Sequence, residues 1–411
     1  MAALFERIPR RVQRATRLLA AVAAVGVLAP ALDASSAVAG EYHVYSCRTP
    51  SGEAAPVGGW SGSVPPGGSN EDHAMDTCSQ RGALVAALGD ATKRIAHLDS
   101  ASWTFRTPAN SQLVGATLWR AGYIHEEAGE NGYYQLWLGG PTAAHMFDEC
   151  FPGRPCSELG QPGQPLASAN RLVVPAANLG SELSINVSCF SGFPDAECGD
   201  GFGDPNGYAA VIYLYAADLI LEQSAPPSAS NVSGELTSAP VLTGTSDVAF
   251  SASDAGSGVY EALFSVDGKV VQSTVLNENG GRCHNVGQTS DGLPAFLYVQ
   301  PCPASVSADV GFDTTRVANG AHHLVVSVID AAGNAATVLD RQVTIDNPPP
   351  PGGPNGTNAS AQATLSVAWS IVTRGGRARS GRARSGRLTS AFGHAQTIVG
   401  VLTGADRKSV V

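Results

Sequence analysis

The sequence has little charge, few aromatic residues and, beyond residue 39, no long apolar run. Charged residues make up 15% and aromatic residues 7% of its 411 residues. With 47 glycines and 26 prolines, the chain does not suit a helical bundle or a coiled coil. Its 43% hydrophobic content excludes a wholly disordered chain. We expect no membrane span, because residues 40–411 contain no uninterrupted stretch of about 18 apolar residues.

The sequence motifs of hydrolysis and of zinc binding are also missing. No G-x-S-x-G motif occurs, and His125-Glu126-Glu127 lacks the second histidine of an H-E-x-x-H site. The absence of any C-x-x-C pair argues against zinc. We therefore expect a protein that is not an enzyme. The alternative is a glycoside-active enzyme that uses a pair of carboxylates as catalytic groups. The acidic residues that could form such a pair would equally suit solvent-exposed loops with no catalytic role. The candidate carboxylates are Glu126, Glu127, Glu130, Asp148 and Glu149.

Residues 1–39 have the pattern of an export signal. Five arginines precede the apolar run 18–32, and Ala37-Val38-Ala39 supplies the small residues of a cleavage site. A basic head, a short apolar core and such a site are typical of a secretory signal peptide. We therefore predict a secreted, extracellular protein, either free or associated with the cell surface.

Eight cysteines agree with export, because disulfides form in oxidising compartments. They fall into four neighbouring couples, and we predict one bridge within each couple, although spacing alone leaves other pairings open. The predicted bridges are Cys47–Cys78, Cys150–Cys156, Cys189–Cys198 and Cys283–Cys302.

Charge is divided along the chain. Residues 40–361 carry 12 Lys and Arg against 32 Asp and Glu, whereas residues 362–411 carry eight against one. The acidic body repels nucleic acid, so we expect no such partner. The arginines from Arg374 to Arg387, which include the repeat at 376–385, fit an anionic wall polymer, a phosphate-rich surface or nucleic acid, and the alternative is a disordered, solvated charge run.

Residues 40–222 predict an antiparallel β-sandwich. Apolar and polar residues alternate at 102–106 and 183–189, which is the period of strands with one buried face, and 208–221 is a longer β-rich run with apolar residues on both faces. Many short strands between long loops rich in Gly, Pro and Asn favour two packed sheets of the jelly-roll kind. Helix is scarce, and 80–97 is the main helical candidate.

Residues 223–346 predict a second sandwich. Asp267-Gly268 stands between alternating segments, which indicates a two-residue hairpin turn. The segment is longer than an immunoglobulin-like module of about 100 residues. We expect the surplus, 277–303, to form a hairpin or loop that carries Cys283 and Cys302.

The rest of the chain is a linker and a basic tail. Residues 347–361 are rich in Pro, Gly and Asn, as in an interdomain linker. Residues 362–411 contain two alternating stretches but too few apolar residues for a core. We predict a truncated, incomplete β module or a disordered tail there.

Two motifs in the second sandwich carry a family resemblance. Ser253-Asp254-Ala255-Gly256-Ser257-Gly258 and Asp330-Ala331-Ala332-Gly333-Asn334 resemble bacterial Ig-like repeats of secreted surface proteins. The layout, from Tyr42-His43-Val44-Tyr45-Ser46-Cys47 onward, is similar to secreted proteins of high-GC actinobacteria with an N-terminal lectin-like sandwich followed by Ig-like modules. The resemblance implies an extracellular role and no known reaction. We expect Asp254 and Asp330 to shape turns through side-chain hydrogen bonds, the alternative being an ion site.

The acidic, glycine-rich stretch 195–206 is a candidate calcium site. Asp200, Asp204 and Asn206 offer hard oxygen ligands on a loop, which suits Ca²⁺. The spacing departs from D-x-[DN]-x-[DN]-G, and the alternative is a polar loop held by the bridge between Cys189 and Cys198. A structural calcium ion is the only cofactor that the sequence suggests.

Aromatic residues on two segments suggest a binding face. If Leu118, Leu136 and Leu138 fill the core, the residues that alternate with them share the opposite face. Aromatic rings stack on the C–H faces of sugars, and amide and hydroxyl groups orient sugar hydroxyls. The alternative is that the tryptophans pack inside. The candidate ligand-binding residues are Thr117, Trp119, Tyr133, Gln135 and Trp137.

The sequence thus favours an exported, non-catalytic binding or adhesion protein. Its N-terminal sandwich would present an aromatic face to a carbohydrate or cell-wall polymer, and the Ig-like module would act as a spacer. The alternatives are the glycoside-active enzyme and a purely structural extracellular protein. The oligomeric state stays open.

Overall fold

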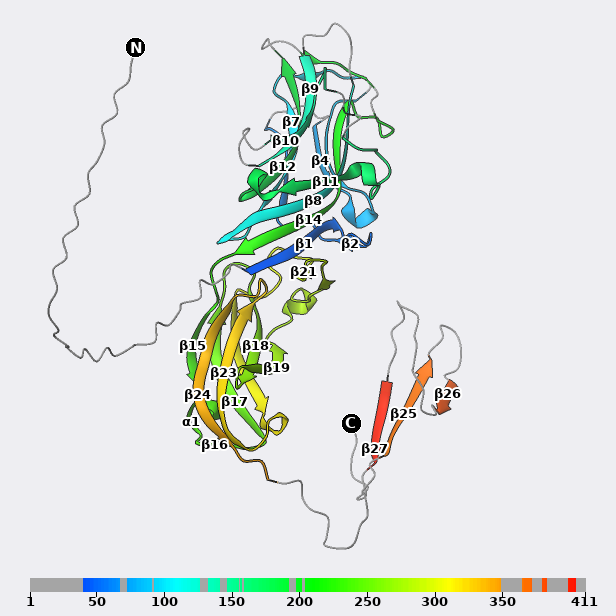
Figure 1. The fold of residues 1–411 in the computed structure, drawn as a ribbon. Coiled ribbons are helices and arrows are strands. Elements are labelled where there is room, and N and C mark those ends of the chain that lie inside the picture. The colour runs from blue at the N-terminus through cyan, green and yellow to red at the C-terminus, as the bar shows by residue number, and fades with distance from the viewer. Residues whose placement is uncertain are drawn as a thin grey trace, which may run out of the picture. The chain divides into compact units, whose positions relative to one another are not determined.

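In the computed structural model, the regular secondary structure of the described residues is almost all β-strand (Figure 1), which confirms the prediction of an all-β fold. The chain divides into two compact units, Met1–Asn347 and Pro348–Val411. The residues that the structure describes are 40–66, 72–90, 92–125, 132–140, 146–154, 156, 159–191, 197–201, 204–348, 364–371, 379–382 and 398–403. The predicted signal peptide and most of the predicted linker therefore lie outside the described residues.

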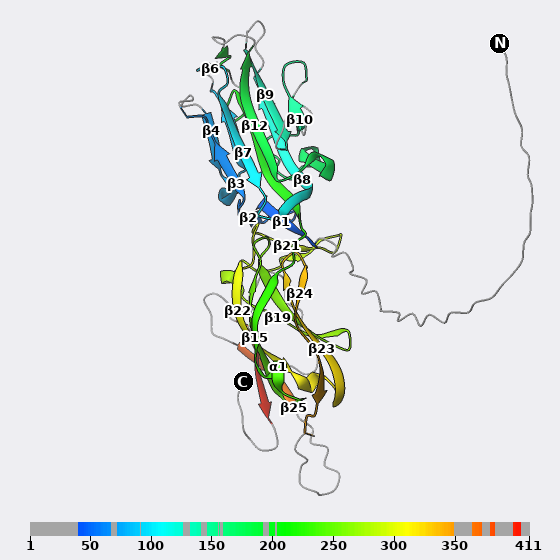
Figure 2. The same ribbon diagram turned by 90° about the vertical axis from the view of Figure 1, so that its left-hand side faces the viewer.

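Two facing sheets make up the first sandwich (Figures 1 and 2). The first sheet contains β1 (Gly40–Arg48), β4 (Asp72–Asp76), β5 (Leu84–Leu88), β8 (Ser111–Ile124), β11 (Arg171–Pro175) and β14 (Ala210–Gln223). The second sheet contains β3 (Trp60–Ser63), β7 (Ser100–Arg106), β9 (Gly132–Gly139), β10 (Met146–Cys150) and β12 (Glu182–Ser191). Short strands β2 (Ala54–Ala55), β6 (Ile95–Ala96) and β13 (Glu197–Cys198) lie at the margins.

The strand pairing is nested. β5 pairs with β14, β7 with β12, β8 with β11 and β9 with β10, each antiparallel. One long hairpin wound into two sheets produces this order, and it is the topology of a jelly roll with two Greek keys. The predicted jelly-roll sandwich is therefore confirmed.

Alternating apolar residues fill the space between the two sheets. Leu136 and Leu138 of β9 point inward beside Leu183 and Ile185 of β12, and all four are fully buried. Each large apolar side chain buried in this way stabilises the fold by roughly 1.5–3 kcal/mol. The sheets approach closely at Gly122, where a Cβ would come within 2.7 Å of Leu136 Cδ2.

The helix expected at 80–97 is wrong, because this segment contains β5. All five residues of β5 are buried, and they face two different apolar clusters. Leu84, Ala86 and Leu88 point into the main core, whereas Val85 and Ala87 point into a cluster on the outer side of the first sheet. A strand covered on both faces has no polar alternation, so its sequence does not differ from that of a buried helix.

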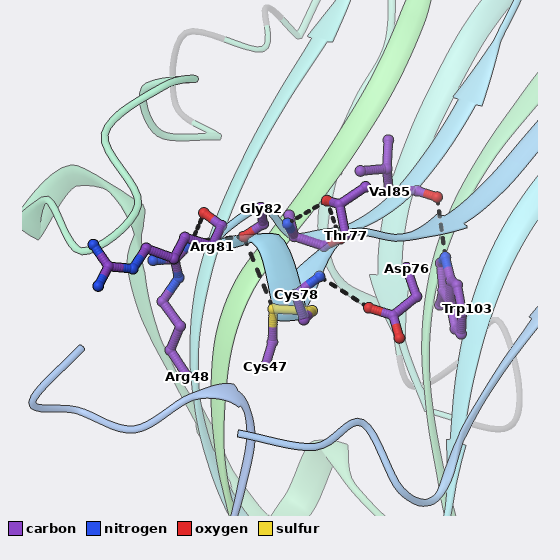
Figure 3. Close-up of a disulfide and its surroundings, with 10 residues drawn as sticks. Cys47, Arg48, Asp76, Thr77, Cys78, Arg81, Gly82, Val85 and Trp103 are labelled. Atoms are coloured by element: carbon purple, nitrogen blue, oxygen red, sulfur yellow. Dashed lines mark hydrogen bonds between the residues drawn. A yellow bond between two sulfur atoms is a disulfide. The ribbon is translucent and has the colours of Figure 1, made fainter. Parts of the chain in front are cut away.

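All four predicted disulfides are present, and the described residues contain no free cysteine. Figure 3 shows the bridge between Cys47 and Cys78, which ties β1 to the short 3-10 turn before β5. The Cys78 amide donates to Asp76 Oδ1 at 2.9 Å, and Arg48 donates to the Gly82 carbonyl at 2.8 Å. The bridge and these hydrogen bonds hold the loop that enters β5.

The second sandwich has immunoglobulin-like topology. Its strands are β15 (Ser228–Ser233), β16 (Val241–Leu242), β17 (Thr245–Ser253), β18 (Val259–Val266), β19 (Lys269–Val275), β22 (Ser305–Asp313), β23 (Gly320–Asp330) and β24 (Ala335–Ile345), with the single-turn helix α1 (Glu235–Ser238). One sheet has the order β15–β17–β22, and the other has the order β16–β24–β23–β18–β19. The predicted turn is confirmed, because Asp267 and Gly268 both have positive φ, 50° and 79°.

The surplus segment 277–303 forms the expected hairpin, which pairs with the jelly roll. Strands β20 (Gly287–Gln288) and β21 (Pro294–Phe296) pair with each other, and β21 pairs in parallel with β1 (Figure 1). Cys283, Phe296 and Cys302 belong to the same apolar cluster as the jelly-roll core. The two sandwiches are therefore joined by a shared sheet as well as by the connecting chain.

The second unit contains three described strands. They are β25 (Thr364–Ile371), β26 (Arg379–Arg382) and β27 (Ile398–Thr403), in the antiparallel order β26–β25–β27. Part of the arginine repeat lies in β26, and the rest of the repeat lies outside the described residues.

Removing the bridge of the inserted hairpin should destabilise the protein more than removing the smallest bridge. Cys283 and Cys302 are 19 residues apart, whereas Cys150 and Cys156 are six apart. We expect replacement of the first pair by serine to lower the free energy of unfolding by about 3 kcal/mol. The same replacement of Cys150 and Cys156 should cost less, since the loop it closes is shorter. Urea denaturation of both variants measures the order, and an equal or reversed order would contradict it.

Candidate functional site

The five candidate ligand-binding residues all point away from the core, but they lie on two different faces. Leu118, Leu136 and Leu138 are fully buried, as expected, so the residues between them turn outward. β8, which carries Thr117 and Trp119, belongs to the first sheet, and β9 belongs to the second. The expectation of one shared face is therefore wrong. Alternation shows on which side of its own strand a residue lies, but not which sheet the strand joins.

The outer face of the first sheet is a packed aromatic cluster. Trp119, Tyr123 and Tyr208 are half-buried and pack against it. Tyr213 and Tyr215 stack with ring centroids 5.7 Å apart and an interplanar angle of 7°. Both tyrosines are only 6% exposed, so little of their ring surface is free for a ligand.

The hydroxyls of these two tyrosines already have partners. The Tyr213 hydroxyl donates to Asp204 Oδ2 and accepts from Asn206 Nδ2 at 2.8 Å. The Tyr215 hydroxyl accepts from the Gly163 amide at 3.0 Å. Burial, the largest cause, raises the pKa of both phenols, and the Asp204 carboxylate raises it further. We therefore assign a structural role to this face, with no ligand site among its buried tyrosines.

The structure places the calcium candidates in a hydrogen-bonded loop. Asp204 Oδ1 accepts from the backbone amides of Asn206 and Tyr208, each at 3.1 Å. Asp200 lies 3.7 Å from Arg94 in an ion pair. Within the described ranges, no group of three or more His, Cys, Asp or Glu side chains is arranged to hold a metal ion. Calcium at Asp200, Asp204 and Asn206 stays a prediction.

The outer face of the second sheet brings the other three candidates together with residues of β12. The register sets Tyr133 opposite Phe190, Gln135 opposite Ser188 and Trp137 opposite Asn186. Residues directly opposite each other in an antiparallel pair point to the same side of the sheet. We call this surface the β9–β12 face; it consists of Tyr133, Gln135, Trp137, Asn186, Ser188 and Phe190.

Aromatic rings are accessible at one end of the β9–β12 face. Tyr133 is 39% exposed and Phe190 43% exposed, and their ring centroids lie 6.1 Å apart. The His97 ring packs edge-on against Phe190 at the same centroid distance. Trp137 is half-buried further along the strand.

Polar groups surround Trp137. In the neighbouring strand β7, Ser100 lies opposite Ser188 and Ser102 lies opposite Asn186. Asn186 Oδ1 is buried and accepts no hydrogen bond from the part of the chain that the structure describes. A buried amide oxygen without a donor costs free energy.

The two described carboxylates of the enzyme alternative are paired with arginines. Asp148 Oδ2 accepts from Arg120 Nε and Nη2, at 2.8 and 2.7 Å. Glu149 accepts from Arg154 at 2.7 Å, on the same side of the sheet as Trp137. Glu126, Glu127 and Glu130 lie outside the described residues.

The sequence-based prediction of this face missed its three β12 residues, Asn186, Ser188 and Phe190. The alternation at 183–189 already set Asn186 and Ser188 opposite the apolar residues of their strand. The pairing of β12 with β9 is a contact between distant segments, and no local signal indicated it.

Adjacent residues of β9 should respond differently to truncation. We expect Leu136→Ala to lower the free energy of unfolding by about 2–5 kcal/mol, because it leaves a cavity between the sheets. Trp137→Ala should cost less than about 1 kcal/mol, because the ring lies on the outer face. Chemical denaturation of both variants measures the difference. Equal costs would show that Trp137 is a core residue.

No helix among the described residues is long and apolar enough to span a membrane.

Comparison with known proteins places the chain in no family. No family model matches it. The human RCC1 domain-containing protein 1 is 38% identical over 63 residues, which cover 15% of this chain and 17% of that protein. Three solved structures show weak likeness: the adhesin domain of Epf from Streptococcus pyogenes, the Spr0440 glycoside hydrolase domain, Endo-D, from Streptococcus pneumoniae R6, and latent PorU from Porphyromonas gingivalis.

These structural likenesses are too low to carry a functional argument. The TM-scores are 0.18, 0.17 and 0.19, with sequence identities of 9%, 9% and 11%. The alignments cover 66%, 64% and 85% of this chain, and 78%, 33% and 30% of those structures. The chain is a disulfide-bonded all-β protein, and its function has to be argued from its own residues.

Proposed function

We propose that this chain is an extracellular, non-catalytic binding protein that attaches to a carbohydrate polymer through the β9–β12 face. The observation that carries the proposal is the position of Trp137 among amide and hydroxyl groups, directly opposite Asn186 in the register of β9 and β12. Aromatic faces next to amide and hydroxyl groups match the chemistry of a sugar ring, which offers C–H faces and hydroxyl edges.

The spacing along β9 suits a polymer better than a single sugar. Tyr133 and Trp137 are four residues apart on one face, which separates them by roughly 14 Å at the rise of an antiparallel strand. Gln135 lies between them, and Ser188 lies opposite Gln135. A chain of several sugar rings would contact both aromatics and hydrogen-bond the polar residues between them.

The disulfides support an extracellular site of action. Four bridges within residues 47–302 are typical of proteins that fold in an oxidising compartment. A carbohydrate or cell-wall polymer outside the cell is a partner that such a protein would meet. The arginine partners of Asp148 and Glu149 support binding without catalysis, since these carboxylates are engaged in ion pairs.

Retention on insoluble polysaccharides tests the proposal, with Trp137→Ala as the variant and Trp119→Ala as the matched control. Both tryptophans are half-buried on outer faces, but of different sheets. With cellulose, chitin and isolated cell wall as probes, we expect the wild type to be retained on at least one. Trp137→Ala should weaken that retention by about tenfold or more, as the loss of a central aromatic anchor does.

The control separates a local effect from a general one. Trp119→Ala should be retained like the wild type. If only Trp119→Ala lost retention, the binding site would lie on the first sheet. If neither the wild type nor the variants were retained, binding of the protein to these polysaccharides would be excluded.

A further inference from the structure

A buried histidine lies where the two sandwiches meet. His43 belongs to β1, the strand that pairs with β21 of the inserted hairpin, and it is 5% exposed. Its Nδ1 lies 2.6 Å from Asp218 Oδ1 of β14, and its Nε2 lies 3.0 Å from Asp291 Oδ2 of the insertion. One ring therefore contacts a carboxylate of each sandwich.

These two contacts require a proton. Neutral imidazole has a single N–H, and an ionised carboxylate can only accept, so both hydrogen bonds form only when His43 is the imidazolium. Burial by itself lowers the pKa of His43, but the hydrogen bonds and charges of Asp218 and Asp291 raise it above the ordinary value. Asp291 stays ionised, because hydrogen bonds from Thr289 first, and then from His43, lower its pKa to about 2.

A second buried cluster crosses the same joint. Gln223, the last residue of β14, is fully buried among loops of the Ig-like module. Its Nε2 donates to Asp254 Oδ1 at 2.6 Å and to Asp330 Oδ2 at 3.2 Å, and its Oε1 accepts from the Ser257 amide at 2.6 Å. Asn334 Nδ2 donates to the Gln223 carbonyl at 3.0 Å.

The two aspartates shape their turns as predicted, and they also face each other across Gln223. Asp254 accepts from the Gly258 amide at 2.7 Å, and Asp330 accepts from the Asn334 amide at 2.9 Å. Burial, followed by the charge of Asp254, raises the pKa of Asp330 to about 6, although hydrogen bonds from Asn334 oppose the shift. Tyr42 of β1 is the other titratable group here; burial and both aspartates raise its pKa, so it stays neutral.

We propose that this joint is an acid-tightened lock, in which a proton on His43 bridges Asp218 to Asp291 and a proton on Asp330 removes its repulsion with Asp254 beside Gln223. The docked sandwiches then hold both protons more tightly than separated sandwiches would. The bound protons stabilise docking of the two sandwiches in mildly acidic surroundings. Docking becomes weaker as the pH rises and these protons are lost.

The direction of the pH dependence of docking follows from the linkage between proton binding and stability. A group whose pKa is higher in the docked state contributes stability that is present at low pH and is lost as pH rises through the docked value. For Asp330 this loss occurs between its ordinary value of 3.8 and about 6. For His43 the loss occurs above its ordinary value of 6.5, because the shift is upward. Tyr45, beside His43, has a pKa raised to about 12 by burial and by Asp218 and Asp291, so it does not titrate in this range.

Hydrogen–deuterium exchange of the full chain tests the lock. The readout is the exchange of backbone amides in 287–296 and 40–46, corrected for the intrinsic pH dependence of exchange. In the wild type, we expect protection of these peptides to fall by about tenfold between about pH 6 and about pH 9, which corresponds to the loss of one charge-assisted hydrogen bond. His43→Gln should remove most of this pH dependence.

His322→Gln is the matched control. His322 also bonds an aspartate, with Nδ1 2.7 Å from Asp267 Oδ2, but it lies at the hairpin turn of the Ig-like module. This variant should keep the pH dependence of the wild type at 287–296.

A second variant keeps the test open should His43→Gln fail to fold. Asp291→Asn preserves the shape of the contact and removes its charge, and it should reduce the pH dependence at 287–296 while leaving the core peptides of β9 and β12 protected. The proposal is overturned if the wild type shows no pH dependence at the joint, or if either joint variant keeps the full dependence.

Discussion

The apolar core between the two jelly-roll sheets determines which side chains reach the surface. Leu136, Leu138, Leu183 and Ile185 must all point into it, and a strand alternates sides at every residue. The residues between them have to face outward, whatever their own preference. Trp137 and Asn186 are on the outside for this reason, and the pairing of β9 with β12 then sets them side by side.

Much of this architecture is readable in the sequence, because local patterns determine it. The four bridges join neighbouring cysteines, the turn at Asp267-Gly268 needs two residues with positive φ, and the leucines next to Trp119 and Trp137 are buried as their alternation indicates. The predictions that were wrong all depend on contacts between segments distant in the sequence. The stretch 84–88 looked helical because both of its faces are covered, and Trp119 was separated from Trp137 by a crossover between sheets that alternation does not encode.

The joint between the sandwiches changes how the Ig-like module should be viewed. As a spacer, it would need only a linker at residues 224–227. The chain instead uses an inserted hairpin to extend the jelly-roll sheet through β1 and β21, and it buries Gln223 among the loops of its neighbour. The joint belongs to the first sheet and the β9–β12 face to the second, so a ligand on that face and a change at the joint would involve different surfaces of the jelly roll. The immunoglobulin-like strand order therefore describes the module's topology but not its attachment.

The proposed function requires the β9–β12 face to contact sugar rings. The most direct measurement is NMR titration of the labelled protein with soluble oligosaccharides cut from the polymer that retains it. We expect the Trp137 indole N–H signal and the backbone amides of 133–137 and 186–190 to shift together and saturate, while the Trp119 indole signal stays in place. Saturating shifts at Trp119 and Tyr123, with none at Trp137, would contradict sugar binding at the β9–β12 face.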